Sequence, residues 1–96
     1  MTAFSEDEII KRLDDFPGWS LDDGVLHRVF EFDGFPAAIG FMVQASRRID
    51  ALNHHPEWTN VYNKVDVRLT SHDAGGVTAS DFELARVLDE LAEPTK

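Results

Sequence analysis

Residues 65–71 begin with a strict alternation of apolar and polar side chains. The apolar phase consists of Val65, Val67 and Leu69, and the polar phase of Asp66, Arg68 and Thr70. Because successive side chains of a strand point to opposite faces, this pattern predicts a strand with one buried face and one face in water. Sheets that are covered on one side only are typically antiparallel. The segment therefore favours an antiparallel sheet with helices on one face.

Turn signals divide the predicted sheet into two hairpins. The alternating strand follows a turn at Asn63-Lys64 and pairs with a strand at Trp58–Tyr62. Earlier, Asp22-Asp23-Gly24 separates Trp19–Leu21 from Val25–Phe32, and Asp-Gly is a strong hairpin signal. Apolar residues fall on both phases of the strand after that turn, so the pattern does not assign its buried face.

Three helices are predicted from their start signals and apolar spacing. Two of them begin with a capping box, Ser5 with Glu8 and Thr78 with Asp81. The first should end before Pro17, and the last should run to Pro94. The remaining helix lies between these two in the chain and is the longest. It has Pro36 in its first turn and runs to about Leu52. Gly40 inside it costs about 1 kcal/mol relative to Ala, so we expect close packing against a neighbour there.

The element order is therefore α-β-β-α-β-β-α. Hairpin-joined strands predict a four-stranded antiparallel sheet with the helices packed on one face, which is an α+β fold. A length of 96 residues fits one domain spanning 1–96, because folding units cluster at about 100 to 150 residues. The sheet has two edges and few residues to cover them, so edge-to-edge association is expected.

Composition excludes several classes of function. The chain has no cysteine, which excludes disulfides, thiolate nucleophiles and cysteine-based zinc sites. Its formal net charge of −9 at pH 7 repels phosphate backbones and anionic membrane surfaces, so we expect no direct nucleic-acid binding and no membrane binding. No apolar run approaches the roughly 20 residues of a membrane span, and the amino end lacks a signal-peptide pattern. These features predict a cytoplasmic protein.

Three of the four histidines stand where predicted elements end and loops begin. His54 and His55 follow the long helix, and His72 ends the fourth strand. Loops on a rigid scaffold commonly carry functional sites. Imidazole gives and takes protons near neutral pH, so several imidazoles indicate general acid and base catalysis. Asp50 lies four residues before His54, where a continuing helix would bring its carboxylate beside the ring.

Two other interpretations of these histidines stay open. Three imidazoles could hold zinc with one open position, but the adjacent side chains of His54 and His55 point apart in extended structure, and the spacing matches no common zinc pattern. Alternatively, His54 is a surface residue whose charge complements the helix dipole, and His72 is a solvated residue on the polar phase of its strand. Spacing alone leaves the function open.

A longer pattern surrounds the histidines. It consists of Asp50-x3-His54-His55-Pro56-Glu57-Trp58-x-Asn60-Val61-Tyr62-Asn63-Lys64-Val65, then Leu69-x2-His72, then Gly76-Val77-Thr78-x2-Asp81. Toward the amino end it continues through Trp19 and Leu26-x-Arg28-x-Phe30-x-Phe32. This pattern closely resembles the pterin-4a-carbinolamine dehydratase family over most of the chain beyond the first helix. Asp50 stands where that family more often has Glu.

The resemblance implies a lyase that removes water from 4a-hydroxytetrahydropterin and gives the quinonoid dihydropterin, in the recycling of tetrahydrobiopterin. It implies no metal and no organic cofactor. It also implies that His54, His55 and His72 line the pterin pocket. We expect His54 and His72 to be the acid and base pair, and His55 to hold the hydroxyl or the ring. The residues expected to contact the pterin are Asp50, Asn53, Pro56, Thr70 and Ser71.

Other residues of the pattern have structural explanations. The position of Asp81 in its capping box already accounts for it. Trp58 and Tyr62 are first of all sheet residues, and only secondarily walls of a pterin pocket. Trp19 and His27 are also interpreted as structural.

Self-association is implied by the resemblance, as a homodimer or homotetramer. Phe41, Met42 and Val43 support it, because three consecutive apolar residues are too many for one narrow stripe. A competing function is a non-catalytic protein-binding module, since members of the family are also known as dimerisation cofactors of a homeodomain transcription factor through a helical surface. Another is an assembly factor in organisms without a pterin-dependent hydroxylase.

Overall fold

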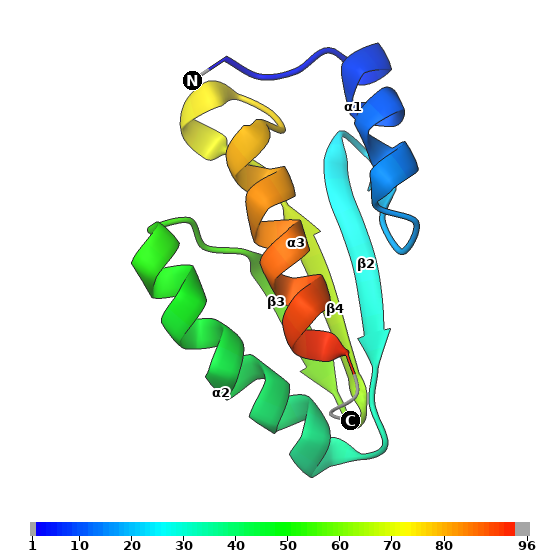
Figure 1. Cartoon of the computed structure of the whole chain (residues 1–96), viewed down its shortest axis with the longest axis vertical. Coiled ribbons are helices and arrows are strands. Elements are labelled where there is room, and N and C mark those ends of the chain that lie inside the picture. Colours follow the sequence, from blue (N-terminus) through cyan, green and yellow to red (C-terminus); the bar gives the residue numbers. More distant parts are fainter. Residues whose placement is uncertain (1, 94–96) are drawn as a thin grey trace.

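The computed structural model describes residues 2–93, whose helices and strands follow the predicted order α-β-β-α-β-β-α (Figure 1). The elements are α1 (Glu6–Arg12), β1 (Ser20–Asp22), β2 (Val25–Glu31), α2 (Phe35–Leu52), β3 (Glu57–Val61), β4 (Lys64–Leu69) and α3 (Ala79–Ala92). Two short 3₁₀ helices follow α1 and β4, η1 (Leu13–Asp15) and η2 (His72–Ala74). The predicted end of the last helix at Pro94 lies outside the described residues.

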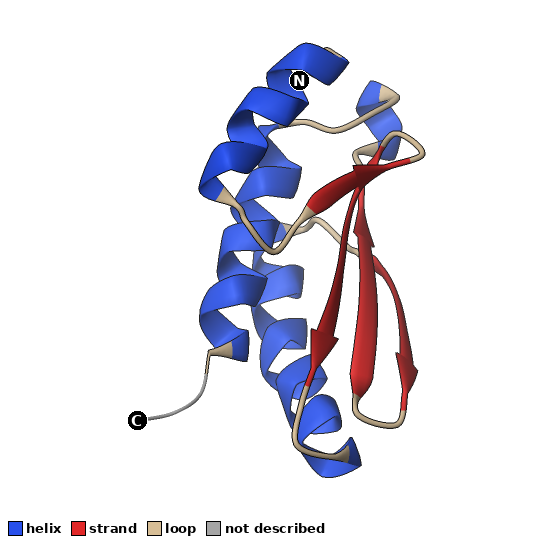
Figure 2. Cartoon of the chain, turned by 90° about the vertical axis from the view of Figure 1, so that its right-hand side faces the viewer, coloured by secondary structure: helices blue, strands red, loops and turns tan. Residues whose placement is uncertain are grey.

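The sheet is antiparallel throughout, with the strand order β1-β2-β4-β3. All three α-helices lie on one face of it, and no helix within residues 2–93 covers the opposite face (Figure 2). The apolar phase of β4 faces the helices, since Val65, Val67 and Leu69 are buried while Asp66 and Arg68 are partly exposed. The predicted α+β fold is confirmed.

Capping boxes begin two of the helices, as predicted. At α1, Ser5 Oγ accepts the backbone N–H of Glu8, and the Glu8 carboxylate accepts the N–H of Ser5. At α3, the Asp81 carboxylate accepts the N–H of Thr78, whose hydroxyl caps the helix in return. Because these bonds satisfy N–H groups that a helix end leaves without partners, they fix where each helix starts.

Strand β2 carries a charged residue on its inner face. Leu26 and Phe30 are buried against the helices, and Arg28 lies between them on the same phase. The guanidinium of Arg28 lies over the Phe30 ring and donates to Asp89 of α3 at 2.7 Å. Trp19 donates its indole N–H to the same carboxylate oxygen at 2.8 Å. Hydrophobic periodicity alone did not assign the buried face of β2, because Arg28 lies on that face while Val25 and Val29 lie on the other.

The core lies between the inner face of the sheet and the helices. Its buried members on the two long helices are Ala38, Phe41, Ala45 and Ile49 on α2, and Phe82, Leu84, Ala85, Val87 and Leu88 on α3. A span across a membrane would need a longer or more apolar helix than any found among residues 2–93.

Three details differ from the sequence-based expectations. Strand β4 ends at Leu69, because Ser71 turns back and exchanges backbone hydrogen bonds with Gly76; His72 therefore begins η2 instead of ending the strand. Tyr62 lies in the β3–β4 turn at φ 52°, not in a strand, and Lys64 begins β4 instead of belonging to the turn. The expected close packing at Gly40 is wrong, since a Cβ there would meet no described atom within 4 Å beyond its own part of the helix.

Candidate active site

The segments that follow α2 and β4 come together at the amino end of α3 (Figure 1). Helix α2 ends because Asn53 adopts the left-handed conformation at φ 52°, which Asn tolerates better than most residues. The chain then leaves the helix axis and carries His54 and His55 toward β3. Strand β4 ends in η2, which places His72 close by. The left-handed conformation of Asn53 and the short helix η2 therefore place the three histidines near one another.

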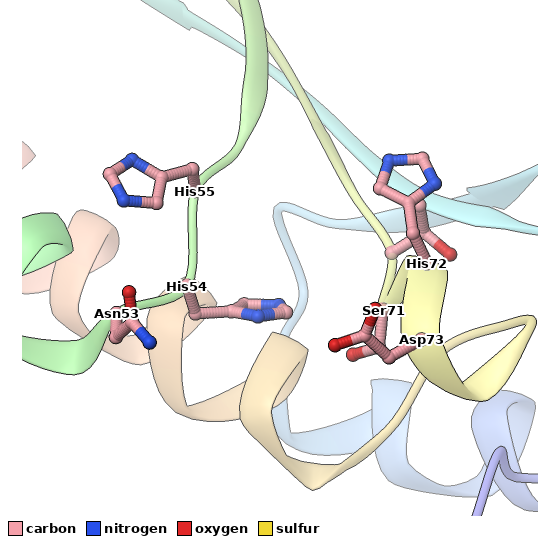
Figure 3. A pocket seen from close by; sticks show the side chains of 7 residues that line it. Asn53, His54, His55, Ser71, His72 and Asp73 are labelled. Atoms are coloured by element: carbon pink, nitrogen blue, oxygen red, sulfur yellow. The ribbon is translucent and has the colours of Figure 1, made fainter.

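A hollow of about 230 Å³ lies between these segments. The residues that line it are Asn53, His54, His55, Thr70, Ser71, His72 and Asp73. A second hollow of about 240 Å³ shares His54, Ser71 and Asp73 with it and extends toward Thr78. The ring of His54 reaches toward Ser71, and the ring of His55 points in the opposite direction (Figure 3). His72 lies across from His54, on the side of Ser71. His54 and His72 thus approach the hollow from two separate segments.

Most of the site residues expected from the sequence line this first hollow. Asp50 and Pro56 do not line it or the second hollow. Asp50 is exposed in the last turn of α2, and Pro56 lies in the loop before β3. The carboxylate that contacts His54 is Asp81 and not Asp50, because α2 ends at Leu52 and no helical turn connects Asp50 to the ring.

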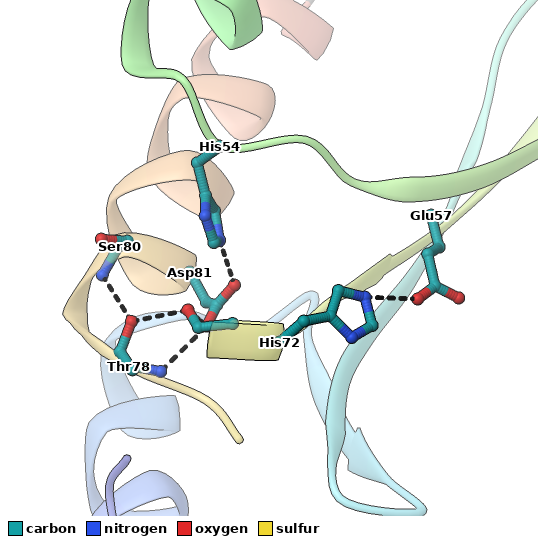
Figure 4. A network of polar contacts seen from close by, with 7 residues as sticks. His54, Glu57, His72, Thr78, Ser80 and Asp81 are labelled. Atoms are coloured by element: carbon teal, nitrogen blue, oxygen red, sulfur yellow. Dashed lines mark hydrogen bonds and ion pairs between the residues drawn. The ribbon is translucent and has the colours of Figure 1, made fainter. Parts of the chain in front are cut away.

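Asp81 lies at the centre of a polar network beneath the hollow (Figure 4). It is 0% exposed, yet both of its carboxylate oxygens accept hydrogen bonds. Oδ1 lies 2.5 Å from Nε2 of His54, and Oδ2 accepts from the Ser71 hydroxyl at 2.8 Å and from the Thr78 N–H at 2.9 Å. These bonds compensate the cost of burying a carboxylate.

The contact with Asp81 determines how His54 can act. A carboxylate accepts hydrogen bonds only, so the pair requires the proton of the imidazole to be on Nε2. Nδ1 is then the nitrogen of the neutral ring that is able to accept a proton from a ligand. In the sequence, Asp81 is explained by the start of the helix, and its place in the family pattern is the one other signal that it belongs to the site. Asp81 both caps α3 and holds His54.

His72 also lies beside a carboxylate, although in a different environment. Its Nε2 lies 3.0 Å from Oε1 of Glu57, at the start of β3 (Figure 4). The two side chains are 74% and 63% exposed, whereas the His54 side chain is 19% exposed. His54 is therefore held by the buried carboxylate of Asp81, beneath the hollow. His72 is held by the solvated carboxylate of Glu57, on the open side of the hollow.

The donors around the hollow do not converge as a metal centre requires. Within residues 2–93, no group of three or more His, Asp or Glu side chains is placed to hold a common ion. His54 and His55 diverge (Figure 3), and Nε2 of His54 is engaged by Asp81. A catalytic zinc site needs three converging ligands, and the described residues around the hollow do not form such a set.

Comparison with known proteins identifies relatives over nearly the whole chain. The family model described as "Pterin 4 alpha carbinolamine dehydratase" matches residues 2–91. A Solibacter usitatus protein is 50% identical over 95% of this chain and 96% of its own length, and an Opitutus terrae protein is 45% identical over 95% of each. Both bear the name "Putative pterin-4-alpha-carbinolamine dehydratase".

A solved structure agrees with this assignment. The crystal structure of a transcriptional coactivator/pterin dehydratase from Brucella melitensis superposes with a TM-score of 0.92 at 39% identity, over 96% of this chain and 100% of the other. The family model covers every residue that lines the hollow. With the match extending over the fold and the histidine segments alike, the chain belongs to the pterin-4-alpha-carbinolamine dehydratase family.

Proposed function

We propose that this chain dehydrates 4a-hydroxytetrahydropterin to the quinonoid dihydropterin, as a hydro-lyase in tetrahydrobiopterin recycling. The observation that supports this reaction most directly is the placement of His54 and His72 on two separate segments around one hollow. Family membership supports a pterin as the class of substrate. The proposal includes a single domain that acts in the cytoplasm without metal or organic cofactor.

The reaction needs two proton transfers. The bond from C4a to the hydroxyl oxygen breaks with its electron pair on oxygen, and a general acid protonates the departing group to water. A general base removes a proton from a ring nitrogen, whose electrons form the new C=N bond. His54 and His72 provide this pair at Nδ1, since their Nε2 atoms face Asp81 and Glu57. The histidine that acts as the acid does so as the imidazolium and gives up its Nδ1 proton, while the neutral ring of the other accepts one. His55 holds the hydroxyl or the ring, and Asn53, Thr70 and Ser71 contact the pterin.

Substitution of the histidines tests the proposal. His54→Ala and His72→Ala should each slow the dehydration by roughly 10²- to 10⁴-fold, the usual contribution of a general acid or base. Stopped-flow absorbance of 4a-hydroxytetrahydropterin decay measures the rates, and circular dichroism checks that each variant is folded. His27→Ala is the matched control, because His27 bonds to Asp66 on the uncovered sheet face and does not line the hollow. Wild-type rates in folded His54→Ala and His72→Ala would exclude this acid and base assignment.

A protein-binding surface is the second candidate, and helix α2 favours it. Phe35, Ile39 and Val43 recur every four residues along the helix and are 49%, 37% and 54% exposed. Phe41 is buried and Met42 half-buried, so Val43 is the apolar residue of that run left on the surface. A continuous apolar stripe of this kind is typical of an interface. It supports self-association as a homodimer or homotetramer through α2.

Charge placed in the stripe should break such an assembly. Val43→Glu is expected to lower the sedimentation coefficient toward that of a monomer, because an interface would bury the new carboxylate without a partner. Analytical ultracentrifugation measures this effect. Ile10→Glu is the control, since Ile10 is similarly exposed at 52% but lies on α1. If the wild-type chain sediments as a monomer, the self-association proposal is wrong. The apolar stripe would then be a binding surface for a different protein.

A further inference from the structure

Glu57 and His72 are 15 residues apart in the chain and belong to two different elements that bring their side chains together. Glu57 is the first residue of β3, where it lies opposite Arg68 of β4 in the sheet register. His72 begins η2, three residues after Leu69 ends β4. Backbone pairing therefore fixes the starting points of both side chains, and Nε2 of His72 lies 3.0 Å from Oε1 of Glu57.

Arg68 and Asp66 are charged residues of β4 on the same face as Glu57, and both have other partners. Arg68 lies opposite Glu57 in the sheet register and could compete for its carboxylate, but Nη2 of Arg68 donates to Asp22 at 2.9 Å. Asp66, the next charged residue on that face of β4, lies 3.1 Å from Nε2 of His27. Both neighbouring groups have partners within the sheet, which leaves Glu57 directed to His72.

We propose that Glu57 is a positioning residue for His72, the acid or base on the open side of the hollow. The inference rests on the proposed function. As an acceptor, the Glu57 carboxylate holds the imidazole proton on Nε2 and turns Nδ1 to the proton transfer with the pterin. It corresponds to Asp81 beneath His54, so each histidine of the pair has its own carboxylate. The site thus contains two His-carboxylate pairs, one buried and one in contact with water.

A double-mutant cycle tests whether Glu57 acts through His72. Glu57→Ala should lower kcat by about two- to fivefold with KM changed by less than twofold, a small loss because the pair is well exposed to solvent. In the His72→Ala background the same change should have no further effect on kcat. Glu31→Ala is the control, because Glu31 is an exposed glutamate at the opposite end of the sheet, opposite Lys64. An unchanged kcat in Glu57→Ala, or an equal loss in both backgrounds, would overturn the inference.

A second measurement is independent of turnover. Long-range ¹H–¹⁵N spectra distinguish the two neutral tautomers of histidine, and His72→Ala assigns the resonances of this ring. Wild type should show His72 mainly as the Nε2–H tautomer, and Glu57→Ala should shift it toward a mixture. If the dehydration assay fails but the tautomer responds to Glu57→Ala, the pairing stands and the proposed function falls. If the tautomer is the same in both proteins, the positioning role is refuted whatever the assay shows.

Discussion

At the scale of single residues, Asp81 shows how one side chain can serve the fold and the site together. Its Oδ2 accepts from Thr78 at the start of α3, and its Oδ1 contacts His54. The capping role could be predicted from Thr78-x-x-Asp81, because a capping box is a local pattern. The contact with His54 could not, since the two residues are 27 apart and meet only when α3 packs against α2.

Asp81→Asn should therefore reduce stability and activity together. The amide keeps the size of the side chain but replaces one acceptor oxygen with a donor, so a buried bond to His54, Ser71 or Thr78 is lost. An unsatisfied buried group costs about 1 to 3 kcal/mol in the free energy of unfolding. Urea denaturation measures the stability, and stopped-flow measures kcat.

Asp66→Asn is the matched control for this substitution. It changes the partner of His27 on the uncovered sheet face, where the carboxylate is solvated and the hollow is not involved. Its effect on kcat should be negligible. An Asp81→Asn variant with full stability and full activity would show that the network beneath the hollow is unimportant to both.

At the scale of elements, local signals predicted the helices and hairpins, and tertiary contacts decided the exceptions. The Asp23-Gly24 hairpin formed as predicted, with positive φ at both residues. The inner face of β2 was not predictable from periodicity, because Arg28 lies on it, paired with Asp89 of α3, while the apolar Val29 lies exposed on the other face. The end of β4 depended on the backbone pairing of Ser71 with Gly76, which leaves no apolar signature.

Gly40 allows the exposed surface of α2 to be tested. Because a Cβ at this position meets no neighbouring atom within 4 Å, Gly40→Ala should raise the free energy of unfolding by about 0.5 to 1 kcal/mol. Gly24→Ala should have the opposite sign, since Gly24 has φ 81°. Chemical denaturation at low protein concentration measures both. A destabilising Gly40→Ala would mean that another surface packs closely on this part of the helix.

At the scale of the whole molecule, one face of the sheet is packed and the other carries paired charges. On the uncovered face, Asp66 with His27 bridges the neighbouring strands β4 and β2, and Asp22 with Arg68 reaches across β2 from β1 to β4. The composition predicted an acidic surface, with a net charge of −9, but not which charges would meet. The hollow lies beyond the ends of α2 and β4, where loops can vary without disturbing the core.

The most direct test of the account is the turnover of 4a-hydroxytetrahydropterin by the wild-type chain, followed by stopped-flow absorbance with substrate in excess. Catalytic amounts of protein should accelerate the decay well above the buffer rate, and a chelator should leave the rate unchanged. A decay no faster than in buffer would contradict dehydration. A rate that the chelator abolishes and added metal restores would contradict proton transfer by His54 and His72 without a metal.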